Sequence, residues 1–461
     1  MKYIVGVVLF LALLLVGALR YGRVKNIFDP LIIFLFLQFL RYSLPLVALD
    51  GEDFFGCYVP FSVENVLSLF FYEFVFVLFA ILPFSFGRTK KQSISIKRSD
   101  EETGHNFKRL TAITAFSIGL LAKVYVIQKL GGFFYVVSHM SESYSKQSSG
   151  FGYISLLYGL MLVGILIELQ RFKILKNKRD LVIAVFMSAI YMGSYLVYSS
   201  RGPAFQLIII WICFFAIYNK GLPLKKLFSP LLILLGIVAG VLSMAVVNMR
   251  NSGNDLTQYD SVSLMLGGII KEFSRSGRDI YCYNEMSDIR WYGMVFLNLL
   301  YMVVPSGIFG NKPPLDDGLY LINAMHGNVY SPNTPRFDMA IQSGSVPFAT
   351  QGLMYVNFGL FGVILGGFVT GLLLKAISNY FYSSRRKNPF FFAYLFFYFC
   401  FMFQITPLLI SSFITNVAVF IPFEIYASQR NKTLSLFRYN KAYVIGSGRT
   451  TRSNLPDNVI D

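Results

Sequence analysis

Arginine and lysine residues that stand within apolar segments are the positions of this chain where chemistry is first expected. Arg201 lies in the stretch YLVYSSRGPAFQLIIIWICFF, where the residues SSRGP form a tight connector. A charged side chain at the centre of a bilayer costs roughly 2.5–3.5 kcal/mol on insertion scales, so it usually lies near an interface, faces a polar cavity or takes part in chemistry. The same three alternatives apply to Arg41 and Lys123, because they also fall within apolar runs.

The polar segment 250–353 contains a second group of cations. In the stretch IIKEFSRSGRDIYCYNE, Arg275 and Arg278 are three residues apart, so on a helix both guanidinium groups share one face. Paired guanidiniums suit phosphate oxygens, because their planar donor forks bind in a bidentate manner. A solvated helix face with local ion pairs is the alternative interpretation. Arg250 and Arg336 are further candidates for binding a substrate.

Three residues of the same segment are candidates for a general base, namely His326, Glu272 and Asp279. The unperturbed pKa of histidine, about 6.5, suits this role, although a lone histidine in a loop is more often structural. The chain has no Gly-rich phosphate loop, no GxSxG or HExxH motif and no paired-Asp motif of metal-dependent sugar-nucleotide transferases. Its four cysteines form no CxxC pair. We therefore expect no metal ion and no cofactor.

The elements that must position these residues are membrane helices. Of the 461 residues, 55% are hydrophobic and 14% are charged, and the apolar residues lie in long blocks, which indicates an all-α polytopic integral membrane protein. The net charge of +17 would fit a nucleic acid, but the basic residues form short clusters between apolar runs, as positive-inside topology explains. We expect membrane lipids and no nucleic acid as partners. About eleven spans are predicted, at residues 3–19, 28–49, 66–84, 110–130, 153–169, 181–198, 203–218, 230–249 and 354–377, with two more within 390–427.

Basic clusters in alternate loops place the N-terminus outside and the C-terminus inside. The apolar stretch 291–310 would invert everything after it if it spanned, and the basic clusters argue against that, so we expect it to lie on or dip into the membrane surface. The chain then divides into an N-terminal membrane region of about eight helices (1–249), a large outer loop with short helices (250–353), a C-terminal membrane region of about three helices (354–427) and a cytoplasmic tail (428–461).

This topology places four cations, Arg41, Lys123, Arg201 and Arg250, at similar depth on the outer side. The positive-inside rule disfavours cations there, so a shared anionic ligand is the sharper interpretation. For Arg201 the alternative is an interfacial anchor whose charge reaches the lipid headgroups.

The layout and three short stretches resemble the Wzy-type O-antigen or oligosaccharide repeat unit polymerases. The stretches are the SSRG turn, VVPSGIFGNKPP and GSVPFATQGLMYVNFGLFG, and the rest of the likeness is the arrangement of spans around one large outer loop. The resemblance implies a metal-independent glycosyltransferase of polysaccharide and lipopolysaccharide biosynthesis, in the bacterial inner membrane with its active site on the periplasmic side. It implies undecaprenyl-diphosphate-linked glycans as substrates and a chain-length regulator protein as a further partner.

Site residues follow from the resemblance only in part. It implies that Arg201 and the loop arginines Arg250, Arg275 and Arg278 hold the substrate. Some members carry an Arg followed by ten residues and a Gly, and this pattern is absent from the large loop here. The choice among the loop arginines therefore stays open. Many relatives carry an acidic residue before Tyr-x-Asn-Phe-Gly, where this chain has Gly352. The expected catalytic residues are Arg201, Arg278 and His326, and the expected substrate-binding residues are Arg41, Lys123, Arg250, Arg275 and Arg336.

Chemistry supports this interpretation independently. The leaving group is a lipid diphosphate, and cations at the outer interface stabilise its developing negative charge. An O-antigen ligase is a close rival that differs only in the acceptor. A flippase or other transporter of lipid-linked sugars is a rival of another class, and transporters commonly show repeats and broken helices. No internal repeat is visible in this chain, and a large share of it forms one outer loop, which disfavours transport.

Overall fold

The computed structural model of the chain describes residues 1–86, 109–139, 143, 152–197, 202–218, 267, 270–271, 273–304, 309–342, 344–382, 389–423 and 425. The longer helices are α1 (Lys2–Val24), α2 (Pro30–Gln38), α4 (Val63–Ser85), α5 (Arg109–Lys129), α9 (Gly159–Leu175), α10 (Lys178–Leu196), α11 (Gly202–Tyr218), α15 (Ser276–Asn284), α18 (Thr350–Tyr382) and α19 (Pro389–Phe397). Short helices are α3 (Leu44–Ala48), α6 (Phe133–Ser138), α8 (Gly152–Leu156), α16 (Met294–Leu297) and α17 (Gly318–Met325), the π-helices η1 (Phe39–Ser43) and η4 (Tyr398–Met402), and the 3-10 helices η2 (Asn298–Val303) and η3 (Arg336–Asp338).

Within the part of the chain that the structure describes, six helices are long and apolar enough to cross a membrane, and this confirms the expectation of a helical membrane protein. They are Lys2–Val24, Pro30–Ala48, Val63–Ser85, Arg109–Lys129, Ile154–Leu175 and Thr350–Tyr382. Three shorter apolar helices, Phe205–Ile217, Phe391–Met402 and Pro407–Phe423, lie where the sequence predicts further spans. The predicted span 230–249 lies outside the described residues, so the count of eleven stays a prediction.

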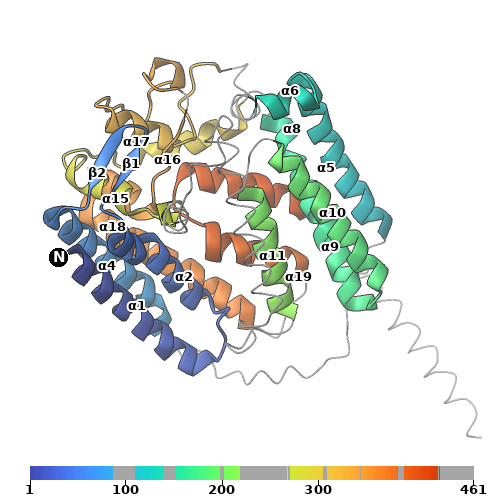
Figure 1. Cartoon of the computed structure of the whole chain (residues 1–461), viewed down its shortest axis with the longest axis horizontal. Coiled ribbons are helices and arrows are strands. Elements are labelled where there is room, and N and C mark those ends of the chain that lie inside the picture. Colours follow the sequence, from blue (N-terminus) through green and yellow to red (C-terminus); the bar gives the residue numbers. More distant parts are fainter. Residues whose placement is uncertain are drawn as a thin grey trace, which may run out of the picture.

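The helices form two groups around separate cores. Figure 1 shows α1, α2 and α4 on one side of the molecule, α5, α9 and α10 on the other, and α11 and α19 between them. Leu46, Val66 and Val363 belong to the core of the first group, which also includes α18. Leu166 and Phe214 belong to the core that α9, α10, α11 and α19 share. The two groups therefore bury their apolar surface largely among their own members.

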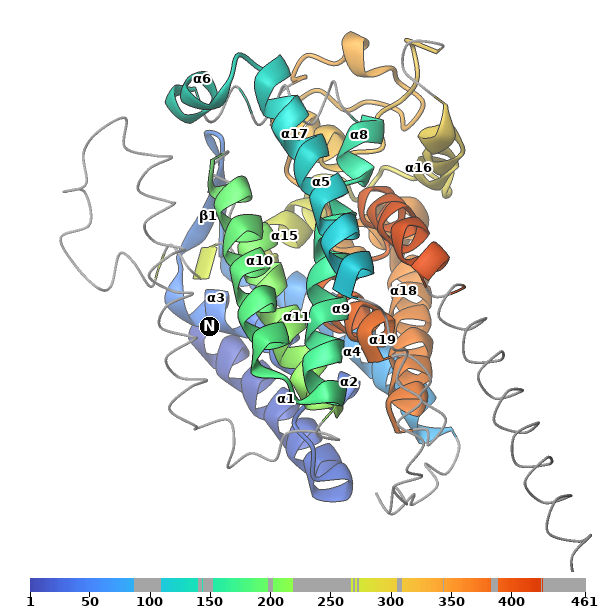
Figure 2. The same cartoon turned by 90° about the vertical axis from the view of Figure 1, so that its right-hand side faces the viewer.

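The described parts of the predicted outer loops gather at one end of the molecule, which we call the outer end. Figure 2 shows β1, α6, α16 and α17 at this end, whereas α1 ends and α2 begins at the opposite end. The sequence predicts only helices, but residues after α3 form a hairpin of β1 (Gly51–Phe54) and β2 (Cys57–Pro60), which pair antiparallel. Asp53 and Gly56 explain the turn, because the Asp53 carboxylate accepts from the Gly56 N–H at 3.0 Å and Gly56 adopts φ 93°.

The stretch predicted to lie at the membrane surface forms no long helix within its described residues. Residues 294–303 are divided between α16 and η2, which are four and six residues long. Both lie at the outer end (Figure 2), and Leu297 and Leu300 of this segment are exposed.

Close backbone packing joins α18 to α4. Gly367 and Gly371, four residues apart in α18, lie against the backbone carbonyls of Phe76 and Ala80 of α4. A Cβ at Gly367 would lie 2.5 Å from the Phe76 oxygen, which is shorter than any real contact. This is the small-xxx-small arrangement by which membrane helices bring their backbones together.

Helix α18 is not one continuous rod, because the chain reverses at Gly359. This residue has φ 62° and ψ −146°, a conformation open essentially to glycine alone. On the far side of the break, a Cβ at Gly366 would lie 3.0 Å from the Met354 Cγ and 3.4 Å from the Thr350 Cγ2. In a straight helix, residues twelve to sixteen apart are separated by about 18–24 Å. Residues 350–358, the short arm, therefore fold back against residues 360–382, the long arm.

The break leaves backbone carbonyls of the short arm without helical partners, and the outer loop supplies donors. The Trp291 N–H donates to the Val356 carbonyl and the Tyr292 N–H to the Asn357 carbonyl, each at 3.1 Å. The Gly293 N–H adds a bond of 2.9 Å to the Asn357 side chain. Such pairing is required for irregular backbone within a membrane protein. The sequence predicts that the span begins at residue 354, but that position lies within the short arm, because Gly359 divides the apolar run.

Candidate functional site

Arg41 and the loop helix α15 are joined through the backbone. Pro45 follows Arg41 by four residues and has no N–H, so the Arg41 carbonyl cannot form its normal helical hydrogen bond. That carbonyl instead accepts from the Arg275 N–H at 3.0 Å and from the Ser276 hydroxyl at 3.2 Å. The same stretch widens into the π-helix η1, a distortion that often marks functional sites.

This junction brings the predicted cations of the second span and of the outer loop together. Arg275 caps the start of α15, and its positive charge acts on that of Arg41. Arg278 stands one helical turn along α15, donates to the Pro347 carbonyl at 3.1 Å and lies over the ring of Phe54 at 5.7 Å. Arg41 donates to the Phe401 carbonyl at 3.4 Å. Three arginines from two distant parts of the chain thus border one region.

Glu52, on strand β1, holds the start of α15 from the other side. It is 4% exposed and accepts hydrogen bonds from the Ser274 hydroxyl and from the Gly277 backbone. Burial raises the pKa of its carboxyl, while Ser274 and the charge of Arg278 act in the opposite direction. The β-hairpin therefore acts as a brace that fixes the first turn of α15 and the two arginines it carries.

Asp279 lies at the centre of the junction and has no solvent exposure. Its Oδ2 accepts from the Tyr42 hydroxyl at 2.6 Å, and its Oδ1 accepts from the Gly352 N–H at 3.1 Å. Burial raises the pKa of this carboxyl to about 7, although both hydrogen bonds and the nearby arginines act to lower it. Asp279 thus ties together η1, α15 and the first turn of the short arm.

Close packing around Gly352 explains why the chain has no acidic side chain at this position. A Cβ at this residue would collide with the Oδ1 of Asp279 and lie 3.0 Å from the Cys282 Sγ. The carboxylate of Asp279 therefore occupies the space that a side chain at position 352 would need. An acidic group lies beside the short arm, but it comes from α15.

A second acidic residue lies deeper, halfway along α4. Glu73 is 1% exposed, and its Oε2 accepts from the Gln351 amide at 2.9 Å. At 1.5 Å per residue, Glu73 lies about 15 Å along α4 from its outer end. The first residues of the short arm therefore begin near the middle of the helix bundle and not at the outer surface.

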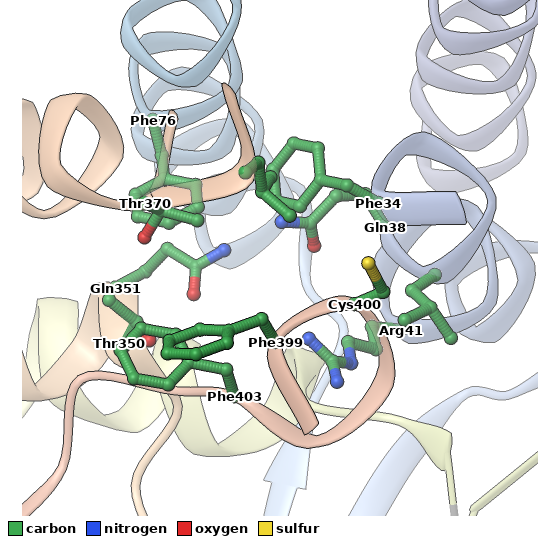
Figure 3. Close-up of a pocket in the computed structure, with 12 residues that line it drawn as sticks. Phe34, Gln38, Arg41, Phe76, Thr350, Gln351, Thr370, Phe399, Cys400 and Phe403 are labelled. Atoms are coloured by element: carbon green, nitrogen blue, oxygen red, sulfur yellow. The ribbon is translucent and has the colours of Figure 1, made fainter. Parts of the chain in front are cut away.

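A small pocket adjoins Gln351 at the same depth. Its polar walls come from α2, η1 and both arms of α18, and its apolar walls come largely from aromatic rings (Figure 3). A cavity of about 20 Å³ at its centre has room for a water molecule. The polar lining residues are Gln38, Arg41, Thr350, Gln351 and Thr370, and the aromatic ones are Phe34, Phe76, Phe399 and Phe403.

Other predicted site residues lie apart from this junction. Lys123 of α5 is fully buried in the second helix group, with its ammonium 3.0 Å from the ring centroid of Tyr195. His326 ends α17, and its ring nitrogens face the carbonyls of Ile322 at 2.9 Å and Phe55 at 3.1 Å, which gives it a bracing position against the hairpin. Arg336 donates to the Gln342 carbonyl at 2.8 Å. Arg201, Arg250 and Glu272 lie outside the described residues.

Several residues of the site are missed by reading the sequence alone. Glu73 is a single acid within the apolar stretch FFYEFVFVLF, and an ionisable residue inside a span marks a functional position by default, so this signal is readable. Pro45 is readable too, since proline within a span frees a carbonyl. Glu52, Tyr42 and Gln351 carry no such signal, because their roles arise from partners far away in the chain.

Comparison with models of known protein families, with curated protein sequences and with solved structures found no match to this chain in any of the three.

Proposed function

We propose that this chain polymerises undecaprenyl-diphosphate-linked oligosaccharide repeat units into a surface polysaccharide such as O-antigen, on the periplasmic side of the bacterial inner membrane. The observation that carries the proposal is the backbone hydrogen bond between Arg41 and Arg275, which holds cations of a span and of the outer loop side by side. The likeness to Wzy-type polymerases supplies the reaction, and the geometry supplies a site suited to its leaving group.

Like charges held together by the fold favour an anionic ligand. The guanidiniums of Arg41 and Arg275 repel each other, yet the backbone bond between the two residues holds their main chains together. The guanidiniums donate to the carbonyls of Phe401 and Ser274, respectively. Guanidinium forks match phosphate oxygens in geometry and retain their charge in proteins. A diphosphate at the membrane surface brings the negative charge that offsets this repulsion, so it fits the site better than an uncharged sugar alone.

The reaction needs little more than positioning and charge stabilisation. An acceptor hydroxyl oxygen bonds to the anomeric carbon of the donor glycan, and the bond from that carbon to the diphosphate oxygen breaks. The electron pair leaves with the lipid diphosphate, where Arg41, Arg275 and Arg278 stabilise the added charge. The hydroxyl proton passes to a base. Both oxygens of Asp279 already accept hydrogen bonds, so this residue positions the site in the observed state.

The proposal is tested by deleting the gene in its own host and resolving the surface glycan on a gel. Loss of the ladder with one repeat unit left on the lipid A core is the expected result, because a single unit can still be ligated. An unchanged ladder would reject the polymerase function. Loss of all glycan would point to a ligase or to a flippase, which act on every chain.

Transport of lipid-linked glycans is a second candidate, favoured by the break in α18. The short arm begins halfway along α4, beside a polar pocket, and broken helices around a midplane site are typical of transporters. Fluorescently labelled short-chain prenyl-diphosphate sugars in proteoliposomes distinguish the two. Transfer between leaflets without elongation would support transport, whereas elongation without leaflet exchange supports polymerisation.

A further inference from the structure

The pocket between α2, α4 and α18 combines a cavity with buried oxygen atoms that lack donors. Gln38 Oε1, Glu73 Oε1 and Thr370 Oγ1 are buried and form no hydrogen bond within the described part of the chain. Gln38 and Thr370 line the pocket, and Glu73 is bonded to a third lining residue, Gln351. Figure 3 shows the side chains of Gln38 and Gln351 reaching into the space from opposite walls.

The chemistry of these atoms selects the occupant. A buried polar atom without a partner costs about 1–3 kcal/mol, so three of them together would be expensive in an empty pocket. Each can accept a hydrogen bond, which calls for a small donor, and the cavity of about 20 Å³ admits one the size of water. A metal cation would also satisfy oxygen ligands, but Arg41 lines the same pocket and its positive charge would oppose a second one. Water fits both the size and the charge.

The surroundings of Glu73 act on its two charge states in opposite directions, and burial, which favours the neutral form, is the largest influence. Burial in the middle of a span and the nearby carboxyl of Asp279 disfavour a negative charge there. The positive charge of Arg41 and the amide donated by Gln351 favour it. Among the described residues, the titratable groups that face Glu73 are Arg41 and Tyr42 on η1 and Asp279 and Tyr283 on α15.

We propose that this pocket is an internal water site and that Glu73 exchanges a proton with the water in it. In the polymerisation reaction, Glu73 receives the proton that the acceptor hydroxyl loses. This role rests on the proposed function. The hydroxyl O–H bond breaks, its proton moves to a water, and a proton of that water moves to the Glu73 carboxylate. The water is regenerated, the acceptor oxygen carries the new glycosidic bond, and Glu73 ends neutral.

The first test is spectroscopic and needs no substrate. Infrared difference spectra of the purified protein are recorded between about pH 5 and about pH 9, a range that covers the titration of perturbed carboxyls. We expect a carboxyl band that changes with pH in the parent and is missing from Glu73→Gln, which keeps the acceptor for Gln351. Transfer to heavy water should shift this band within minutes, because an internal water can exchange its protons.

A matched variant addresses the water itself. The double variant Gln38→Leu with Thr370→Val removes two of the three acceptors without altering Glu73, and it should slow the shift of the Glu73 band in heavy water at least tenfold. An unchanged exchange rate in this variant would reject the water site. If no band depends on Glu73 at either pH, the residue keeps one protonation state and the proposal is wrong, whatever the host ladder shows.

The kinetic test separates proton exchange from a purely structural role. Loss of a general base slows a reaction by about 10²–10⁴-fold, and the rate then loses the decline at acid pH that protonation of the base causes. We expect both effects in Glu73→Gln and partial recovery in Glu73→Asp. A slower rate with the parental pH profile would show that Glu73 only supports the fold. This result would leave the polymerase function itself intact, since the deletion ladder tests that separately.

Discussion

The backbone N–H of Arg275 lies 3.0 Å from the carbonyl oxygen of Arg41, a residue more than two hundred positions earlier in the chain. The bond exists because Pro45 cannot use that carbonyl, so a proline inside one span selects the docking point of the outer loop. It fixes two like charges at a distance where each acts on the other. The fold therefore holds two cationic residues next to each other.

Replacement of Pro45 tests how much this docking depends on the missing N–H. Alanine at this position restores a donor that competes with Arg275 for the Arg41 carbonyl. A hydrogen bond contributes about 1 kcal/mol, so we expect amide exchange at Arg275 to accelerate about fivefold. Pro30→Ala is the control, because a proline in the first turn of α2 removes no helical bond. Equal exchange in both variants would contradict the role of Pro45.

Asp279 predicts a specific dependence of stability on pH. Burial raises the pKa of this carboxyl from 3.8 to about 7, so the folded state holds its proton more tightly than the unfolded chain does. Its contribution to stability is full below about pH 3.8 and is lost as the pH rises through about 7. We expect Asp279→Asn to gain thermal stability relative to the parent above neutral pH and to show a flatter profile. A parental slope in this variant would exclude Asp279 as the source.

Gly352 should tolerate no side chain. An added Cβ would meet the Asp279 carboxylate and lie 3.0 Å from the Cys282 Sγ, and overpacking of this kind costs about 1–3 kcal/mol. We expect Gly352→Ala to lower the melting temperature and to shorten or abolish the glycan ladder. Gly193→Ala is the matched control, since no atom lies within 4 Å of a Cβ there. Similar melting temperatures for the two variants would mean that α15 can shift away from the short arm.

The sidedness of the molecule can be tested by cysteine labelling. Ser331 is exposed in the outer loop, and Asn177 is exposed in the turn between α9 and α10 at the opposite end. In a background without native cysteines, Ser331→Cys should react with an impermeant maleimide in intact spheroplasts and Asn177→Cys should not. Reversed labelling would place the arginine site on the cytoplasmic side and remove the basis for a periplasmic reaction.

The sequence predicts the helical membrane architecture, and six of its predicted spans lie on described helices long and apolar enough to cross a membrane. It does not predict the reversal at Gly359, because the residues on both sides are equally apolar. Hydropathy does not show whether an apolar segment continues straight or folds back on itself. The YVNFG stretch holds the relevant signals, a glycine with an asparagine that accepts from the loop, but their meaning depends on Trp291 and Tyr292 far away in the chain.

The prediction of the site is uneven for a related reason. The sequence groups Arg41 with Lys123, Arg201 and Arg250 by depth in the membrane, and it groups Arg275 with Arg278 by helical spacing. The structure instead brings Arg41 next to Arg275 and Arg278. Lys123 has a similar predicted depth but lies in the other helix group, since depth does not fix lateral position. The deeper residues Glu73 and Gln351 come together only because the short arm folds back.

Diphosphate binding by the purified protein is the most direct test of a substrate site at the three arginines. Farnesyl diphosphate is titrated into the parent, Arg275→Lys and Arg278→Lys, with farnesol as the uncharged probe. Lysine keeps the charge but loses the bidentate fork, so we expect each variant to bind the diphosphate at least about tenfold more weakly, a loss of about 1.4 kcal/mol. Lys271→Ala, which changes an exposed residue of the same loop, should bind like the parent. Equal affinity of the parent and both arginine variants, or equal binding of farnesol, would contradict a diphosphate site at Arg41, Arg275 and Arg278.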